Sequence, residues 1–161
     1  MKVIRGDLLK LAIDKKFDVI IHGCNCYCTM GAGIAKAIRD TFPEACDADL
    51  KTEKGSLNKL GTISYATVSR NDHEITIVNG YTQYHWNGAG ILADYDAIRS
   101  VMRHVKAKFS GKRIGYPKIG AGLAKGDWNR ISKIIDEELA GEEHTLVEFA
   151  MGNSCRAGAG S

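Results

Sequence analysis

The amino-acid sequence predicts an α/β fold, a three-layer α/β/α sandwich around a mixed, mostly parallel sheet of about six strands. Short runs rich in β-branched residues alternate with segments of helical periodicity, as is typical of parallel sheets covered by helices. A hairpin-like pair in the middle, Thr62–Ser69 and Glu74–Asn79, makes the expected sheet mixed. The length of 161 residues suits one domain with a substantial core.

The other expected strands are short runs that contain β-branched residues. Asp18–His22 is almost continuously apolar, which is typical of a strand buried on both faces of a parallel sheet. The remaining strands are expected at Lys2–Arg5, Arg113–Ile119 and Thr145–Phe149.

Helical periodicity predicts the segments that cover the sheet. The clearest pattern spans Ala93–Phe109, where apolar residues recur on one face. Leu8–Phe17 is either a weak helix or an irregular turn. Further helices are expected at Gly31–Phe42, at Pro43–Lys54 and at Trp128–Leu139.

Two segments lack regular patterns. Gly80–Ile91 is aromatic, polar and rich in glycine, so we expect a surface loop. The last residues, NSCRAGAGS, show no periodicity and predict a frayed end. We therefore expect a single domain at residues 1–150 and a flexible C-terminal tail at residues 151–161.

Composition and charge narrow the classes of function. The formal net charge of +3 is mild and suits a small anionic ligand. Basic residues do not gather in the long stripe that nucleic-acid-binding proteins usually carry. No run approaches the roughly 18 apolar residues that span a bilayer, and the first residues do not resemble a signal peptide. These features predict a cytoplasmic protein without membrane partners.

The cysteine pattern argues against a metal centre. In the cytoplasm the five cysteines are expected to be reduced. Cys24, Cys26 and Cys28 alternate as C-x-C-x-C, whereas zinc sites use C-x2-C pairs. We expect small side chains in a tight turn, and neither a metal nor a cofactor.

Two glycine turns suggest a phosphate-bearing ligand. The hexamer GAGIAK at Gly31–Lys36 recurs as GAGLAK at Gly120–Lys125, each after an expected strand. Glycines let the backbone approach an oxyanion, and a following helix offers free N–H groups. One such turn alone is better explained by packing than by binding, but its repetition favours binding from two sides. Neither turn is a P-loop or a dinucleotide-binding G-x-G-x-x-G.

Four motifs in order resemble those of macrodomains, the ADP-ribose-binding modules, along about Met1 to Phe149. They are G-D-L after the first strand, I-I-H-x-C-N-C at the end of the second, M-G-A-G-I-A, and Y-P-K-I-G-A-G-L with a downstream tryptophan. Within that superfamily the chain is similar to the small branch of ADP-ribose 1″-phosphate phosphatases and terminal ADP-ribose protein glycohydrolases.

The resemblance implies a set of ligand-binding residues. Asp7, beside the Leu8 backbone, accepts from the adenine amino group, although a carboxylate there also suits a turn. Phe149 either flanks the adenine or belongs to the core. The residues expected around the diphosphate and distal ribose are Gly31, Ala32, Gly33, Ile34, Lys118, Ile119, Gly120, Ala121, Gly122 and Leu123.

Three residues are candidates for catalysis. The resemblance places Asn25 at the distal ribose, where an amide bonds sugar hydroxyls or orients a water. His22 either acts as an acid or base on a phosphate ester or is a satisfied core histidine. Asp127 is either a catalytic carboxylate or only the N-cap of the last helix.

Three functions follow from the resemblance. The first is hydrolysis of ADP-ribose 1″-phosphate to ADP-ribose and phosphate, without a metal. The second is removal of ADP-ribose from modified protein or nucleic acid, and the third is binding without turnover. The glycohydrolases use a lysine after the hairpin and an aspartate after G-x-G-L, where this chain has Gly80–Gln83 and Ala124. That difference counts against the glycohydrolase chemistry, and the sequence His22-Gly23-Cys24-Asn25-Cys26 resembles the phosphatase pattern more closely, which favours the phosphatase.

Overall fold

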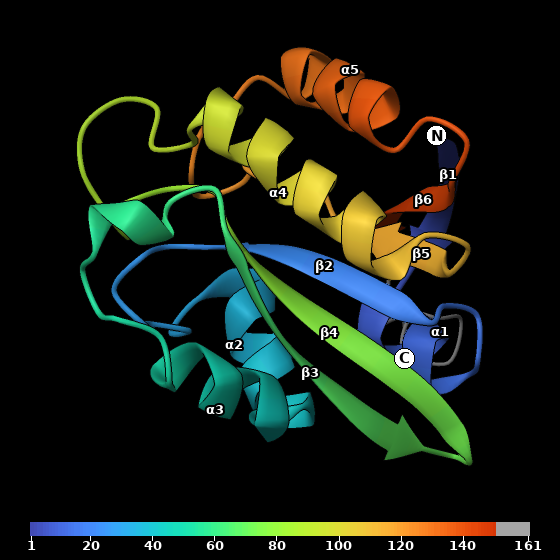
Figure 1. Ribbon diagram of the computed structural model, residues 1–161. Coiled ribbons are helices and arrows are strands. Elements are labelled where there is room, and N and C mark those ends of the chain that lie inside the picture. The colour runs from blue at the N-terminus through green and yellow to red at the C-terminus, as the bar shows by residue number, and fades with distance from the viewer. Residues whose placement is uncertain (151–161) are drawn as a thin grey trace, which may run out of the picture.

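The structure is a computed structural model that describes residues 1–150, so the expected tail at 151–161 lies outside the described residues. A six-stranded sheet of order β1-β6-β5-β2-β4-β3 lies between two layers of helices. Helices α4 and α5 cover one face, while α1, α2 and α3 cover the other (Figure 1). This confirms the predicted three-layer α/β fold.

The elements alternate as the sequence predicts. The strands are β1 (Lys2–Gly6), β2 (Val19–Cys24), β3 (Ile63–Arg70), β4 (His73–Tyr81), β5 (Arg113–Tyr116) and β6 (Glu143–Phe149). The helices are α1 (Leu8–Ile13), α2 (Gly33–Thr41), α3 (Pro43–Leu50), α4 (Tyr95–Phe109), α5 (Trp128–Glu138) and a short 3-10 turn, η1 (Leu57–Lys59).

Strand β2 is the centre of the sheet. It pairs in parallel with β4 on one side and with β5 on the other. Only the β3–β4 hairpin is antiparallel, which is the expected mixed sheet. The three central residues Val19, Ile20 and Ile21 are buried because helices cover both faces of the strand.

Several boundaries differ from those expected. Strand β5 ends at Tyr116 rather than Ile119, because Pro117 has no N–H for the ladder. Strand β4 continues to Tyr81, into the expected loop. Of the two interpretations of the Leu8–Phe17 segment, the structure has a short helix, which Asp7 caps by accepting from the N–H of Leu9 at 3.0 Å.

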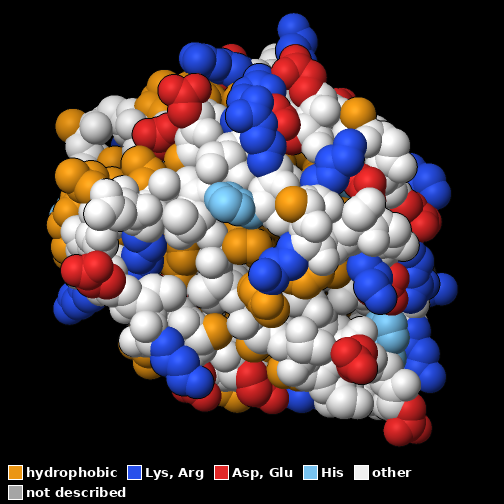
Figure 2. Space-filling view, in the orientation of Figure 1, with side chains coloured by type: hydrophobic (Ala, Val, Ile, Leu, Met, Phe, Trp, Pro, Cys, Tyr) orange, Lys and Arg blue, Asp and Glu red, His pale blue; other side chains and the backbone are white. Residues whose placement is uncertain are grey.

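The surface carries charges of both signs. In Figure 2, lysine and arginine side chains lie among aspartate and glutamate side chains, mainly toward the edges of this face. Hydrophobic side chains gather at the left of the view, on the side where β2 and β4 end in Figure 1. Within residues 1–150, no helix is both long and apolar enough to cross a membrane.

Candidate functional site

A cavity of about 750 Å³ lies where the central strands end. Parallel strands place their carboxyl ends on one edge of the sheet, and ligands of such folds bind outside that edge. Three connections supply the walls: β2 to α2, β4 to α4, and β5 to α5. A volume of this size is within the range of small-molecule sites.

The first glycine turn forms one wall of the cavity. Gly31, Ala32, Gly33 and Ile34 all line it. Gly33 has a φ of +57°, a left-handed conformation that glycine adopts without strain. Ala32 is the N-cap of α2 and its side chain makes no capping bond, so within residues 1–150 no N-cap side chain satisfies the N–H groups of the first turn. This arrangement favours an anion.

The second glycine turn forms the opposite wall. Its residues Lys118, Ile119, Gly120, Gly122 and Leu123 line the cavity, whereas Ala121 does not. The Gly120 φ of +75° and a bond from the Gly126 N–H to the Gly120 carbonyl (2.7 Å) shape the loop.

The two turns meet across the cavity. The Leu123 Cδ1 lies 3.8 Å from the place where a side chain on Gly33 would begin. The structure therefore brings the two repeated hexamers together around one space, as their repetition predicts.

Asn25 lies at the end of β2 and lines the cavity, although it is only 8% exposed. Its Oδ1 accepts from the Tyr27 N–H at 2.8 Å, and its Nδ2 donates to the Thr29 Oγ1 at 2.6 Å and to the Thr29 carbonyl at 3.2 Å. Both amide hydrogens are thus used within the loop. One acceptor position of Oδ1 is left for a hydroxyl or a water.

His22 is a core residue, which corrects the expectation that it acts in the site. It is completely buried, and its Nε2 bonds the Asn79 Oδ1 at 2.7 Å. Burial lowers the pKa of His22 to about 4, against the opposing effect of the Asn79 hydrogen bond. The ring is therefore neutral at pH 7 and does not line the cavity.

Asp127 is the N-cap of α5 and does not line the cavity, while its catalytic role stays a prediction. Its Oδ1 accepts from the Asn129 N–H at 3.0 Å at the start of α5, and its own N–H donates to the Tyr95 hydroxyl. It does not line the cavity walls. Capping alone explains the residue.

We expect the Asp127→Ala variant to lose about 1 kcal/mol of unfolding free energy, because a helix donor loses its partner. Urea denaturation measures this loss, and Asp127→Asn, which retains a capping oxygen, is the matched control. An unfolding free energy in Asp127→Ala equal to that of the wild type would show that the carboxylate does not stabilise the start of α5.

The residues expected around the adenine lie at the same edge of the sheet but outside the cavity walls. Asp7 follows β1, and Phe149 ends β6 opposite Gly6 in the β1–β6 pair. Phe149 is 73% exposed, so the core alternative for it is wrong. The Leu8 side chain is buried, which leaves only its backbone for a ligand. Their contact with adenine stays a prediction.

The structure adds cavity residues that sequence reasoning missed. Gln83 and Trp86, from the loop after β4, line the cavity beside Thr29. Trp86 is 48% exposed and stacks on His85 with ring centres 4.1 Å apart. The position of this loop after a central strand indicates that it lies near the site. Nothing in the loop sequence distinguishes Gln83 and Trp86 from their neighbours as cavity residues.

The cavity is poor in ionisable side chains. Among its lining residues, all within 1–150, only Cys24 and Lys118 ionise. Burial raises the pKa of the Cys24 thiol well above its ordinary value, so the thiol stays neutral. Lys118 is exposed at the cavity rim, 4.0 Å from the Glu148 carboxylate. No cavity side chain is thus suited to act as a base near neutral pH.

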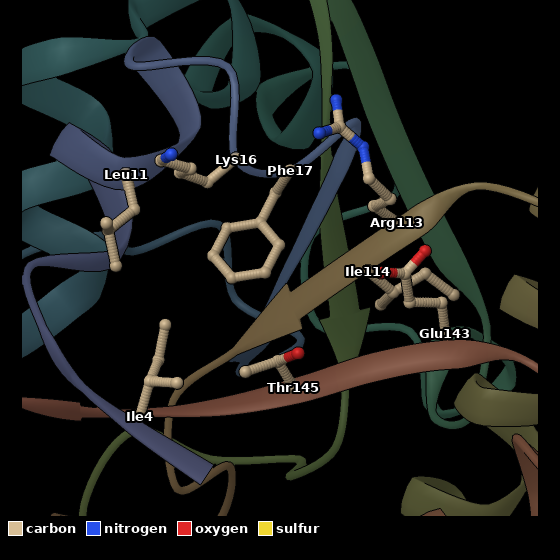
Figure 3. A pocket seen from close by; sticks show the side chains of 8 residues that line it. All are labelled: Ile4, Leu11, Lys16, Phe17, Arg113, Ile114, Glu143 and Thr145. Atoms are coloured by element: carbon tan, nitrogen blue, oxygen red, sulfur yellow. The ribbon is translucent and has the colours of Figure 1, made fainter. Parts of the chain in front are cut away.

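A second, smaller hollow of about 230 Å³ lies away from these turns (Figure 3). The Phe17 ring occupies its centre, between the side chains of Leu11, Ile4 and Thr145. The Arg113 guanidinium at its rim is bonded to Asp18 and holds the pKa of that carboxyl at about 2. None of the sequence-predicted site residues lines this hollow.

Comparisons with solved structures agree with this architecture. The macrodomain of Thermus aquaticus DarG has a TM-score of 0.67 at 19% identity, over 92% of this chain and 95% of that one. Thermosipho africanus DarTG in complex with ADP-ribose has a TM-score of 0.70 at 18% identity, over 94% of this chain and 41% of that one. At such identities the likeness shows the fold alone.

Sequence comparison shows the family. The chain is 34% identical over 154 residues to an uncharacterized 17.5 kDa protein in the tk-vs intergenic region of Enterobacteria phage T4, covering 92% of this chain and 96% of that protein. A model of the Macro domain family matches residues 21–135. Repeated glycine turns, sheet order and family match agree, and the chain therefore belongs to the Macro domain family.

Proposed function

We propose that this protein binds ADP-ribose in the cavity between its two glycine turns and hydrolyses ADP-ribose 1″-phosphate to ADP-ribose and phosphate. The observation that carries the binding is the pair of turns at Gly31–Ile34 and Gly120–Leu123, which enclose one space from opposite sides. Backbone N–H groups at the start of α2 suit a diphosphate.

The order of the strands suits the rest of the ligand. Asp7 and Phe149 lie on the β1–β6 side, where an adenine and its amino group would extend. Asn25 lies on the β2 side, where the distal ribose would end. The Thermosipho africanus protein with the same fold, solved with ADP-ribose, supports this choice of ligand.

The scarcity of ionisable side chains in the cavity favours the phosphate ester among ADP-ribose derivatives. A phosphate monoester carries its own acid–base group, with a second pKa of about 6, so it needs no protein base to move the proton. The free acceptor position of the Asn25 Oδ1 would orient the attacking water. Charge that develops on the phosphate would be stabilised by the backbone N–H groups.

Two other functions compete with this reaction. Removal of ADP-ribose from modified protein or nucleic acid calls for a positioned base, and Asp127, the carboxylate considered for it, is an N-cap outside the cavity. Binding without turnover needs only the glycine turns. Both are tested with the same protein.

The test combines three measurements on the wild type: calorimetry with ADP-ribose, phosphate release from ADP-ribose 1″-phosphate, and ADP-ribose release from modified protein or nucleic acid. We expect binding and phosphate release. The rate of phosphate release should fall at least about tenfold in the Asn25→Ala variant. This corresponds to a rise of about 1.4 kcal/mol in the activation free energy. Asn87→Ala, an exposed asparagine of the β4–α4 loop, is the matched control.

Each outcome separates the candidates. Binding without either release would leave a binding module. Release of ADP-ribose from a modified macromolecule, with no phosphate release, would replace the phosphatase with the glycohydrolase. No detectable binding of ADP-ribose would contradict the whole proposal.

A further inference from the structure

Lys59 lies beneath the cavity wall that Asn25 belongs to. We call residues 25–29 the Asn25 loop, which connects β2 with the approach to α2. Lys59 comes from η1, between α3 and β3, and only 7% of it is exposed. Lysine is seldom buried to this degree without a specific set of partners.

Two of the three acceptors of the Lys59 ammonium belong to the Asn25 loop. Its Nζ donates to the Cys26 carbonyl at 3.1 Å and to the Cys28 Sγ at 3.4 Å. The third acceptor is the Glu53 carbonyl at 3.4 Å. An ammonium has three donors, and here they join the loop to the segment that follows α3.

An aromatic ring and a carboxylate lie near the Lys59 ammonium. Its Nζ lies 4.6 Å from the centre of the Tyr81 ring, within the range of a cation–π interaction. The Tyr81 hydroxyl donates to the Asp49 Oδ1 at 2.7 Å, and Asp49 is a buried carboxylate. Ring and carboxylate together compensate a cation that would otherwise be costly to bury.

The Asn25 loop depends on contacts from outside itself. Cys28 has a φ of +58°, a left-handed conformation that is unfavourable for a residue with a Cβ. The bonds from Asn25 to Tyr27 and Thr29 form only when residues 26–28 follow this path. Lys59 contacts the residues on both sides of Tyr27, so it constrains that path directly.

We propose that Lys59 is a positioning residue for the ligand site: by holding Cys26 and Cys28 it orients Asn25 and Thr29 toward the cavity. The inference rests on the proposed function, because the affinity it affects is that for ADP-ribose. Lys59 itself does not line the cavity. Its effect on a ligand therefore passes through the loop.

The first test is calorimetry with ADP-ribose on Lys59→Met, which keeps the apolar stem and removes the donors. We expect the Kd to rise at least about fivefold at a temperature where thermal melts show the variant folded. Lys54→Met replaces an exposed lysine of the preceding turn and is the matched control. A rise below fivefold would overturn the proposal.

A double-mutant cycle with Asn25→Ala separates positioning from general destabilisation. If Lys59 acts through the Asn25 loop, Lys59→Met should raise the Kd by a smaller factor in Asn25→Ala than in the wild type. Independent, additive effects on affinity would show that Lys59 does not act through Asn25, and would overturn the inference. Stability alone, measured as Tm, does not decide this test.

A ligand-independent measurement keeps the inference apart from the proposed function. The Tyr27 N–H, bonded to Asn25, should exchange with solvent at least about tenfold faster in Lys59→Met. The Gly126 N–H, in the opposite turn, should be unchanged. If the wild type binds no ADP-ribose, the proposed function fails, but the exchange rate of the Tyr27 N–H still tests the role of Lys59. An exchange rate that is the same in Lys59→Met and in the wild type would overturn that role.

A second variant tests the proposal if Lys59→Met does not fold. Cys28→Ala removes one acceptor of the ammonium, together with the bond from the Cys28 Sγ to the Asp49 carbonyl (3.3 Å), and retains Lys59. The rise in the ADP-ribose Kd should then be at least about threefold, smaller than for Lys59→Met because the Cys26 contact is retained. A smaller rise contradicts the proposal.

Discussion

The Gly122→Val and Gly31→Val variants are expected to fold normally and to lose ADP-ribose affinity by at least about 100-fold. Both glycines line the cavity, and a Cβ added at either would have no atom within 4 Å, so the unliganded protein accepts the side chain. A bound diphosphate would not accept the valine side chain, because its methyl groups keep the diphosphate oxygens away from the backbone N–H groups. Two lost charge-assisted hydrogen bonds, at about 1.5–3 kcal/mol each, account for such a loss.

Calorimetry with ADP-ribose and a thermal melt check this prediction together. Ala140→Val, which introduces the same side chain at an exposed alanine after α5, is the control and should bind as the wild type. Wild-type affinity in Gly122→Val and Gly31→Val would show that the ligand does not approach the glycine turns. The proposed binding mode would then be wrong.

The second large effect concerns stability and pH. We expect His22 to make the protein about 3 kcal/mol less stable as the pH falls from 7 to about 4. Burial lowers the pKa of His22 from 6.5 to about 4 in the folded state. The unfolded chain then binds the proton more readily, so the stability present above pH 6.5 is lost as the pH falls toward 4.

Urea denaturation of the wild type and of His22→Gln across this pH range measures the contribution of His22 to the pH dependence of stability. The variant should show a flatter profile by about 3 kcal/mol, whereas His104→Gln, at an exposed histidine of α4, should not. Phosphate release at pH 7 should persist in His22→Gln, because the ring lies outside the cavity. Identical pH profiles for wild type and His22→Gln would contradict the assignment of a neutral, buried ring.

The sequence predicted the elements of the fold because their signals are local. Alternating apolar runs and helical periodicity reflect burial of each segment, and the hairpin at Thr62–Asn79 shows in composition alone. Boundaries that depend on pairing were less accurate. The continuation of β4 to Tyr81, for example, needs a partner strand 57 residues earlier, at Cys24.

The repeated hexamers are recognisable in the amino-acid sequence alone. Their glycines need particular backbone conformations, and Gly33 and Gly120 have positive φ in the structure. That both turns meet at one cavity follows from parallel strands, whose carboxyl ends share an edge. Their contact with a diphosphate stays a prediction.

The roles of polar side chains were decided by tertiary structure. His22 and Asn25 are three residues apart, yet one is bonded to Asn79 in the core and the other lines the cavity. Lys59 had no sequence signal, since its two acceptors in the Asn25 loop lie 31 and 33 residues earlier. By itself the sequence determined the elements, the glycine turns and the family. Only the folded chain determined which polar groups face the ligand, because burial and hydrogen-bond partners come from strands and loops distant in sequence.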